Sequence, residues 1–241
     1  MRRSLTIAVA LLACCPAAVA APGQTEADIL RIHREALGGT AAIASLRAFC
    51  AEGVTKHEAG EVEFTLWAAR PAKLRLESRL GGKTMVQSYD GVTAAWGMPA
   101  GGAPELLAPG EAREFIAGAD FDGPLVDPGA KGLAVTYAGE SEVAGRPCLH
   151  LMLAARDLEL IELFVDAETY LLLKRISARP ELPDTGRLET FFSDYRPVGG
   201  VMMPFRVMTF EGERKVTDTR IERIAPLAAL PDSLFEMPTG G

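Results

Sequence analysis

The sequence has little of what catalytic, nucleic-acid-binding and membrane-spanning proteins display. It contains three histidines, and it has no G-x-S-x-G elbow, Walker loop, Rossmann fingerprint or H-E-x-x-H motif. It also lacks any block of lysines or arginines, and its formal net charge of -7 argues against a nucleic-acid surface. Beyond the amino-terminal segment, no apolar run is long enough to span a bilayer. We therefore expect no enzyme activity, no cofactor and no nucleic-acid partner.

Length and composition favour a single β-rich domain. The chain has 241 residues with 48% hydrophobic content, which is enough for one substantial core, and 24% charged content, which excludes a disordered chain. We expect residues 21–241 to form this one domain and the protein to be a monomer.

The first twenty residues have the organisation of a signal peptide. Arg2 and Arg3 form a basic start, a short apolar stretch follows, and Ala18-Val19-Ala20 is a small-residue cleavage site. We therefore predict that residues 1–20 are removed and that the protein is periplasmic. An alternative is a lipobox ending at Cys14, which would anchor the mature chain through a lipidated cysteine.

Two cysteines, Cys50 and Cys148, remain in the predicted domain. An even pair in an exported chain is compatible with a disulfide. Such a bond would close a long loop and stabilise the folded state by roughly 4 to 5 kcal/mol in the entropy model. The other interpretation is two buried free thiols. The sequence does not decide between them.

Apolar periodicity predicts two short helices followed by many strands. Thr25 and Asp28 form a predicted capping box, and the first helix ends at Gly38-Gly39 before a second one over Thr40 to Leu46. From Ala48 the period changes to two, which indicates about five strands, with hairpin turns at residues 81–82 and 90–91. Seven further alternating runs follow between residues 133 and 225. Strands that follow one another without helices indicate an antiparallel meander that must curl or close.

The segment 97–132 interrupts this pattern. It is rich in Gly, Pro and Ala, and it contains one predicted helix near Glu111 to Ala117. A long insertion in a β domain is usually functional. We interpret this segment as a helical plug or flap.

Metal binding has weak support in the sequence. Asp120, Asp122 and Asp127 cluster, but the twelfth position of an EF-hand loop starting at Asp120 is Lys131 rather than an acid. The histidines, His33, His57 and His150, lack zinc-ligand spacing. We expect no metal site.

The apolar strand face is the best candidate for a binding site. Curled sheets of this size enclose cavities that accommodate one small ligand. We predict a cavity for an elongated apolar ligand, covered by the helical segment around Phe115 and Ile116, with a wall formed by Val62, Phe64, Leu66, Leu74, Leu76 and Trp96.

Six segments of the chain form a recognisable pattern of turns and apolar strands: residues 35–47, 88–96, 119–125, 143–153, 164–175 and 194–206. Together they resemble bacterial envelope proteins of the LolA-like, outer-membrane lipoprotein-sorting type. The resemblance implies an unclosed antiparallel β-barrel of about eleven strands, with short α-helices plugging the concave face. It also implies a carrier of lipoprotein acyl chains.

Three functional hypotheses follow. The first is a non-catalytic carrier or binding protein for a lipidic or acyl ligand, with lipoprotein sorting as one form of this role. The second is an envelope scaffold that uses the same barrel to bind another protein. The third is a hydrolase of unknown type.

Overall fold

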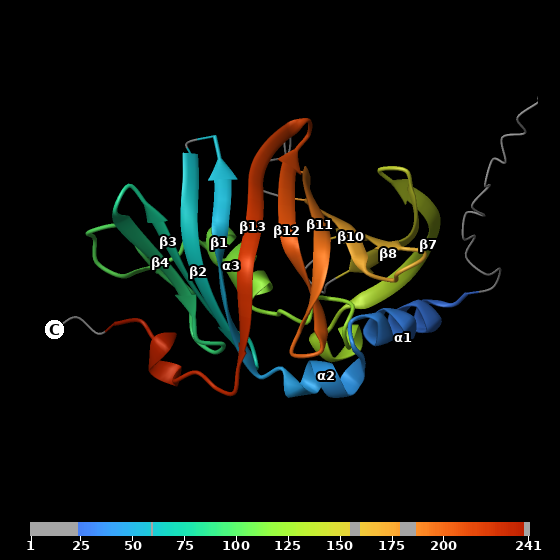
Figure 1. Ribbon diagram of the computed structural model, residues 1–241, viewed down its shortest axis with the longest axis horizontal. Coiled ribbons are helices and arrows are strands. Elements are labelled where there is room, and N and C mark those ends of the chain that lie inside the picture. Colours follow the sequence, from blue (N-terminus) through green and yellow to red (C-terminus); the bar gives the residue numbers. More distant parts are fainter. Residues whose placement is uncertain (1–23, 59, 155–159, 179–186, 239–241) are drawn as a thin grey trace, which may run out of the picture.

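The chain folds as one large curved sheet with helices on its concave side (Figure 1). The computed structural model describes residues 24–58, 60–154, 160–178 and 187–238, so the predicted signal peptide and Cys14 lie outside the described residues. The α-helices are α1 (Glu26–Ala36), α2 (Gly39–Ser45) and α3 (Pro109–Gly118), with 3-10 turns η1 (Pro128–Lys131) and η2 (Asp232–Leu234). Among the described residues, no helix is both long and apolar enough to cross a membrane.

Thirteen antiparallel strands make up the sheet. They are β1 (Ala48–His57), β2 (Gly60–Ala69), β3 (Lys73–Leu80), β4 (Lys83–Tyr89), β5 (Trp96–Met98), β6 (Glu105–Leu106), β7 (Ala134–Val143), β8 (Arg146–Ala154), β9 (Leu160–Asp166), β10 (Leu172–Ala178), β11 (Arg187–Val198), β12 (Val201–Glu211) and β13 (Arg214–Leu227). Their order is β6-β5-β4-β3-β2-β1-β13-β12-β11-β10-β9-β8-β7, and the sheet is not closed across the described residues. The predicted fold class is therefore confirmed. The count exceeds the expected eleven because two very short strands, β5 and β6, extend one edge.

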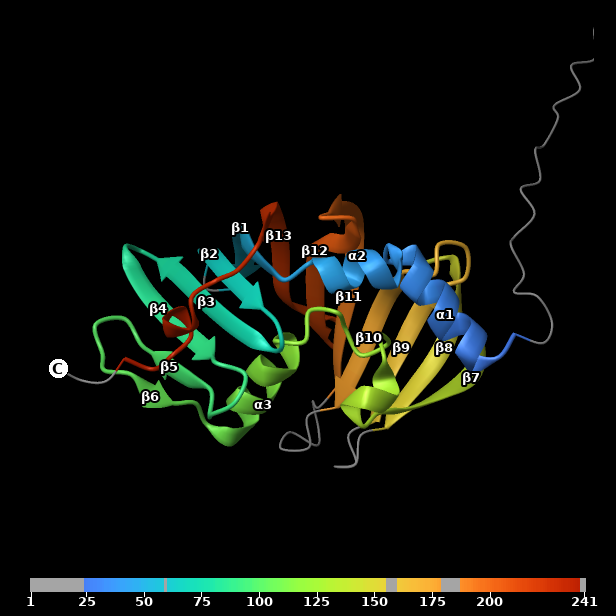
Figure 2. The ribbon, with the colours of Figure 1, turned by 90° about the horizontal axis from the view of Figure 1, so that it is seen from below.

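The topology explains why the chain contains a long insertion. The first meander runs outward from β1 to the β6 edge, and the second runs inward from the opposite edge, β7, to β13. Antiparallel pairing of β1 with β13 joins the two meanders at the centre. The segment between β6 and β7 must therefore travel from one edge to the other, and it does so across the concave side with α3 between the two halves (Figure 2).

Local sequence signals set the beginning of α1 and the approach to α2. The Thr25 side chain accepts from the Asp28 backbone amide, and the Asp28 carboxylate accepts from the Thr25 amide, so the predicted capping box is confirmed. Gly38 separates the helices with φ 119°, and a Cβ there would overlap the Gly200 carbonyl oxygen. Only glycine permits this backbone conformation and this close approach.

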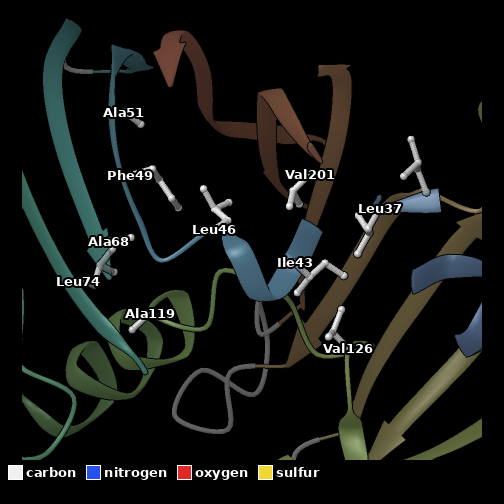
Figure 3. Close-up of a cluster of buried hydrophobic side chains, with 11 residues drawn as sticks. Leu37, Ile43, Leu46, Phe49, Ala51, Ala68, Leu74, Ala119, Val126 and Val201 are labelled. Carbon is white, nitrogen blue, oxygen red and sulfur yellow. The ribbon is translucent and has the colours of Figure 1, made fainter. Parts of the chain in front are cut away.

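The main hydrophobic core lies between the helices and the centre of the concave face (Figure 3). Its buried members are Leu37, Ile43, Leu46, Phe49, Ala51, Ala68, Leu74, Ala119, Val126, Leu171 and Val201. A second cluster places Ile29 of α1 on Leu149, Leu151, Leu153, Leu163 and Val165 of the second meander. The helices thus fill part of the concave face of both halves.

One local expectation is wrong, and one open alternative is decided. Residues 81–82 do form the β3–β4 turn, but the link after β4 spans residues 90–95 and is a loop rather than a tight hairpin. Cys50 and Cys148 are free thiols, so the disulfide alternative is excluded. Cys50 lies on β1 and Cys148 on β8, and β13, β12, β11, β10 and β9 separate these strands. Six steps of about 4.8 Å put the two positions roughly 29 Å apart along the sheet, whereas a disulfide needs Cα atoms within about 7 Å.

Candidate ligand-binding site

Five of the predicted cavity residues share one face of the first meander. Leu66 lies opposite Leu76, and Ala68 lies opposite Leu74, so β2 and β3 present these side chains together. Val62 and Phe64 follow on the same face of β2 by the period of two. The list is therefore one continuous surface: Val62, Phe64, Leu66, Leu74 and Leu76.

A glycine on the neighbouring strand allows this surface to pack closely. Gly53 of β1 pairs with Phe64 of β2, and a Cβ at Gly53 would overlap the Phe64 ring and the Arg220 carbonyl. The ring therefore lies directly against the β1 backbone. Phe64 is only 8% exposed, so it supports the surface from within rather than lining an opening.

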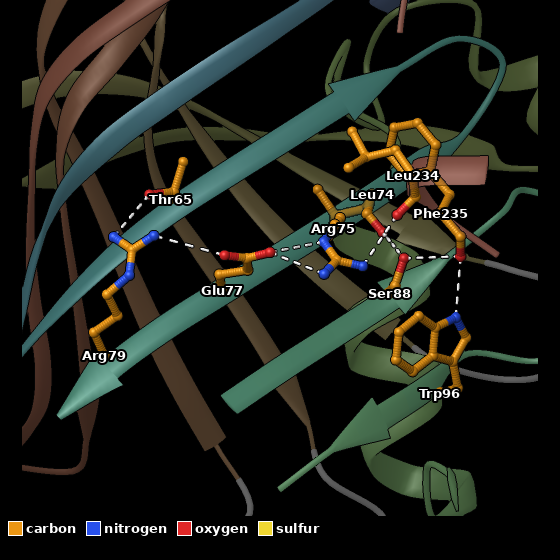
Figure 4. A network of polar contacts seen from close by, with 9 residues as sticks. All are labelled: Thr65, Leu74, Arg75, Glu77, Arg79, Ser88, Trp96, Leu234 and Phe235. Carbon is orange, nitrogen blue, oxygen red and sulfur yellow. Dashed lines mark hydrogen bonds and ion pairs between the residues drawn. The ribbon is translucent and has the colours of Figure 1, made fainter. Parts of the chain in front are cut away.

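Trp96 does not belong to this surface. It pairs with Ser88, which pairs with Arg75, and Arg75 faces away from Leu74 and Leu76. The indole Nε1 donates to the Phe235 carbonyl at 3.0 Å, so Trp96 is enclosed by the carboxy-terminal segment on the convex side (Figure 4). The prediction that Trp96 lines the concave cavity is wrong, because the irregular loop before β5 changes which face the alternation continues on.

The predicted covering helix lies where the sequence placed it. Phe115 of α3 packs against the main core cluster, as does Leu66 of β2. A Cβ at Gly118 of α3 would lie in ordinary contact with the Leu74 side chain. Ile116 is half-buried on the same helix. The helix therefore contacts the apolar face formed by β2 and β3, while its role as a movable flap remains a prediction.

A pocket opens at the edge of this apolar surface. It has a volume of about 560 Å³. Its lining consists of Leu76, Ser78, Met85, Val86, Gln87, Gly97, Met98, Pro99, Glu105, Leu106, Leu107, Ala108 and Glu111. Met85 is 43% exposed and Leu106 is 62% exposed, so large apolar side chains meet solvent here. The Gln87 amide donates to the Glu111 carboxylate at 2.7 Å and ties the first turn of α3 to β4.

Arg70 ties the crossover segment to α2. Its Nε donates to the Leu46 carbonyl at 3.0 Å, and one Nη donates to the Ile43 carbonyl at 2.7 Å. Both Nη groups also donate to the Asp122 carboxylate, at 2.5 and 2.7 Å. This hydrogen-bonded carboxylate raises the pKa of Arg70. Sequence reasoning missed the tether, because nothing local links residues 70 and 122.

The aspartates weighed as metal ligands each contact a cationic side chain. Asp122 accepts from Arg70, Asp120 accepts from Lys131 at 2.6 Å, and Asp127 accepts from Arg34 at 3.0 Å. Within the described ranges, no group of three or more His, Cys, Asp or Glu side chains is placed to hold a metal ion. Asp122 and Asp127 instead connect the crossover segment to its surroundings, and Asp120 makes a contact within the segment.

The three histidines lie on separate elements. His33 is buried in α1, where its Nδ1 is 2.6 Å from the Tyr170 carbonyl oxygen and must donate to it. His57 ends β1. His150 lies on β8, stacked on Phe164 with ring centroids 4.6 Å apart. None of the three lines the pocket.

No family model and no curated protein matches the chain. Solved structures do share its architecture. A DUF1329 family protein from Desulfovibrio piger superposes with a TM-score of 0.62 at 14% identity, covering 88% of this chain and 98% of that chain. A LolA superfamily protein from Nitrosomonas europaea superposes with a TM-score of 0.60 at 15% identity, covering 88% and 98%. The fold is LolA-like.

A third structure agrees with this assignment. A putative outer membrane lipoprotein-sorting protein domain from Vibrio parahaemolyticus gives a TM-score of 0.60 at 12% identity, covering 88% of this chain and 97% of that chain. The resemblance to LolA-like proteins noted in the sequence is therefore confirmed for the fold. The match covers nearly the whole length of each of these three proteins, so the LolA-like fold accounts for both meanders of this chain and their connection.

Proposed function

We propose that this protein is a non-catalytic periplasmic carrier or binding protein for a lipidic or acyl ligand. The observation that carries the proposal is the continuity of the apolar concave surface of β2 and β3 with the pocket at Leu76. The similarity of its fold to that of a LolA superfamily protein and of a putative lipoprotein-sorting domain supports this function. Lipoprotein sorting is the specific role that we infer from that similarity.

The size and lining of the pocket suit an alkyl chain. Small-molecule sites usually enclose roughly 300 to 1,000 Å³, and this pocket has a volume of about 560 Å³. Each methylene removed from water contributes roughly 0.8 kcal/mol before ordering costs, so ten methylenes would contribute about 8 kcal/mol. A contribution of about 8 kcal/mol corresponds to micromolar affinity, which is therefore the tightest binding expected for a chain of ten methylenes once ordering costs are subtracted.

The lining also supports a role without catalysis. Glu105 and Glu111 are the ionisable side chains among the pocket residues that the structure describes, and Ser78 is the one hydroxyl there. Nucleophilic catalysis needs a nucleophile next to a general base that is itself oriented by a third group. A serine with two carboxylates at the rim does not form this arrangement, which favours binding over hydrolysis.

A direct test begins with the natural ligand. Protein purified from the periplasm under mild conditions should carry lipid, which solvent extraction and mass spectrometry would identify. A fluorescent fatty-acyl probe should bind the delipidated protein, and Leu76→Asp should weaken that binding at least tenfold by placing a charge in the pocket. Val92→Asp is the matched control, because Val92 is 85% exposed in the loop after β4. Purified protein without lipid, together with no probe binding, would refute the proposal.

The same preparation tests export. Intact mass should show a chain beginning at Ala21. A chain beginning at Cys14 with added acyl mass would instead support the lipid-anchored alternative, and an unprocessed chain would refute a periplasmic location.

An envelope scaffold remains the second candidate, and one observation favours it. The strand β6 forms one edge of the sheet and carries Leu106 with 62% exposure. Exposed sheet edges of this kind can accept a strand from a partner. Crosslinking from a photoreactive residue at position 106 in intact cells would identify a protein partner if this function holds, and crosslinking to lipid alone would contradict it.

A further inference from the structure

A row of polar side chains crosses the concave face of the second meander. Arg175 of β10 pairs with Thr190 of β11, Thr190 pairs with Thr209 of β12, and Thr209 pairs with Thr217 of β13. Directly paired residues of neighbouring strands point to the same side of a sheet. On its other side Arg175 pairs with Leu163, which is fully buried in the cluster beneath α1. The row therefore belongs to the concave face.

The guanidinium at the end of this row is incompletely satisfied. The Nε of Arg175 is buried and finds no hydrogen-bond partner among the described residues. Burial is the largest influence on this side chain and lowers the pKa of the guanidinium, while the field of Glu114 on α3 acts in the opposite direction. A buried cation without full hydrogen bonding is costly, and an oxyanion would offset that cost.

The three threonines supply hydroxyl groups beside the cation. The Oγ1 atoms of Thr190 and Thr209 are 3.5 Å apart, and Thr217 lies opposite Thr209 on β13. A threonine hydroxyl can donate one hydrogen bond and accept others, so Thr190 and Thr209, the two threonines nearest to Arg175, can complete the coordination of an anion held by the arginine. Neighbouring strands are about 4.8 Å apart, and the row therefore extends over roughly 14 Å.

Helix α3 links this polar row to the apolar surface. Glu114 of α3 is close enough to Arg175 to influence its ionisation. The next residue, Phe115, packs against the core cluster that also contacts Leu66. Because Glu114 and Phe115 are consecutive, the same turn of α3 faces the polar row on one side and the apolar wall on another, so a molecule at this turn would meet a cation at one end and apolar side chains at the other. This is the arrangement that a single-chain amphiphile requires.

We propose that Arg175, Thr190 and Thr209 bind the oxyanion head group of an amphiphile whose alkyl chain lies on the apolar concave surface, and that Thr217 continues the polar row beyond the head group. A carboxylate and a phosphate share the chemistry that matters, since both present two oxygens to the fork of a guanidinium. The inference deepens the proposed acyl-binding function and rests on it. The ligand class is therefore an anionic single-chain amphiphile rather than a neutral lipid.

The test compares three ligands of equal chain length: a fatty acid, the corresponding alkyl phosphate and the corresponding fatty alcohol. Each displaces a fluorescent probe from the delipidated mature protein. Arg175→Gln should weaken the affinity for the acid and for the phosphate by about tenfold to a hundredfold, as expected for the loss of a charge-assisted hydrogen bond. The affinity for the alcohol should change by less than about twofold. Arg175→Lys should fall between the wild type and the glutamine variant, because it keeps the charge and loses the fork. Whichever anion binds the wild type more tightly indicates the source of the head group.

Two controls separate this role from a structural one. Arg206→Gln also removes one positive charge, but Arg206 points to the opposite face, where it pairs with Asp218 at 3.0 Å, so it should leave all three affinities unchanged. Circular dichroism and thermal unfolding show whether each variant is folded.

The outcomes are distinct for the inference and for the function beneath it. If all three ligands bind the wild type and Arg175→Gln affects them equally or not at all, the head-group site is wrong and acyl binding stands. If no ligand binds the wild type, both are wrong. If Arg175→Gln weakens the binding of the acid and the phosphate but not of the alcohol, the head-group site and the acyl-binding function are both supported.

Discussion

Replacing Arg70 by Met tests the tether between the crossover segment and α2. The substitution removes four hydrogen bonds, two to carbonyls of residues 43 and 46 and two to Asp122, and it keeps most of the apolar stem. It leaves the Asp122 carboxylate, which is 14% exposed, without its partner. Because this tether connects segments that are distant in the sequence, its loss should destabilise the whole domain.

The magnitude follows from the partial burial of the pair. Removing one partner of a fully buried ion pair costs about 3 to 5 kcal/mol, and losing a hydrogen bond to a charged group costs about 1.5 to 3 kcal/mol. The Arg70 side chain is 24% exposed, so water replaces part of what is lost. We expect Arg70→Met to lower the free energy of unfolding by about 2 to 3 kcal/mol. For a domain of this size the melting temperature should fall by roughly 4 to 12 °C.

Denaturant unfolding followed by circular dichroism measures this change. Arg70→Lys should lose less stability than Arg70→Met, because lysine keeps the charge opposite Asp122. It should still be less stable than the wild type, because an ammonium group cannot reach both carboxylate oxygens and both backbone carbonyls at once. Lys56→Met is a control at an exposed ion pair with Glu61 and should show no measurable change. An Arg70→Met variant as stable as the wild type would refute the reasoning, since it would show that water fully replaces these contacts.

Three further predictions concern other residues of the fold. Burial lowers the pKa of His33, so the unfolded chain takes up the proton first. The stabilisation that comes from neutral His33 should therefore be fully present above about pH 6.5. Below that pH the free energy of unfolding should fall by at most about 1.4 kcal/mol per pH unit. Unfolding experiments at several pH values should show a smaller slope for His33→Asn. Gly38→Ala should lower the free energy of unfolding by about 3 to 5 kcal/mol, because the added Cβ would overlap the Gly200 carbonyl oxygen. Gly60 has a similarly positive φ but open space around it, so Gly60→Ala should lower it by about 1 to 2 kcal/mol. Equal losses in the two variants would contradict the clash at Gly38. In a thiol-labelling assay without reductant, Cys50 should react faster than Cys148, which is 1% exposed, and both should react fully in denaturant; a protected pair would contradict the free thiols.

The elements that sequence analysis predicted correctly depend on local interactions. The capping box at Thr25 joins residues three apart, and the turn at residues 81–82 joins adjacent strands. The seven alternating runs after residue 133 correspond to β7 to β13, because each strand has one face packed and one face toward water. Leu66, Leu74 and Leu76 were grouped correctly for the same reason, since a period of two continues across a short hairpin.

The sequence by itself thus determined the strands, the α1 cap and one apolar face, because each is specified by neighbours along the chain. Only the tertiary structure decided the pairing of β1 with β13, the contact of Arg70 with Asp122 and the separation of the two cysteines. It also decided that Trp96 faces the carboxy-terminal segment, because an irregular loop does not preserve the face on which a strand continues. The polar row from Arg175 to Thr217 is likewise a feature that only the tertiary structure decided. Its members are unremarkable in sequence, and they form a row because the register of four strands places them side by side.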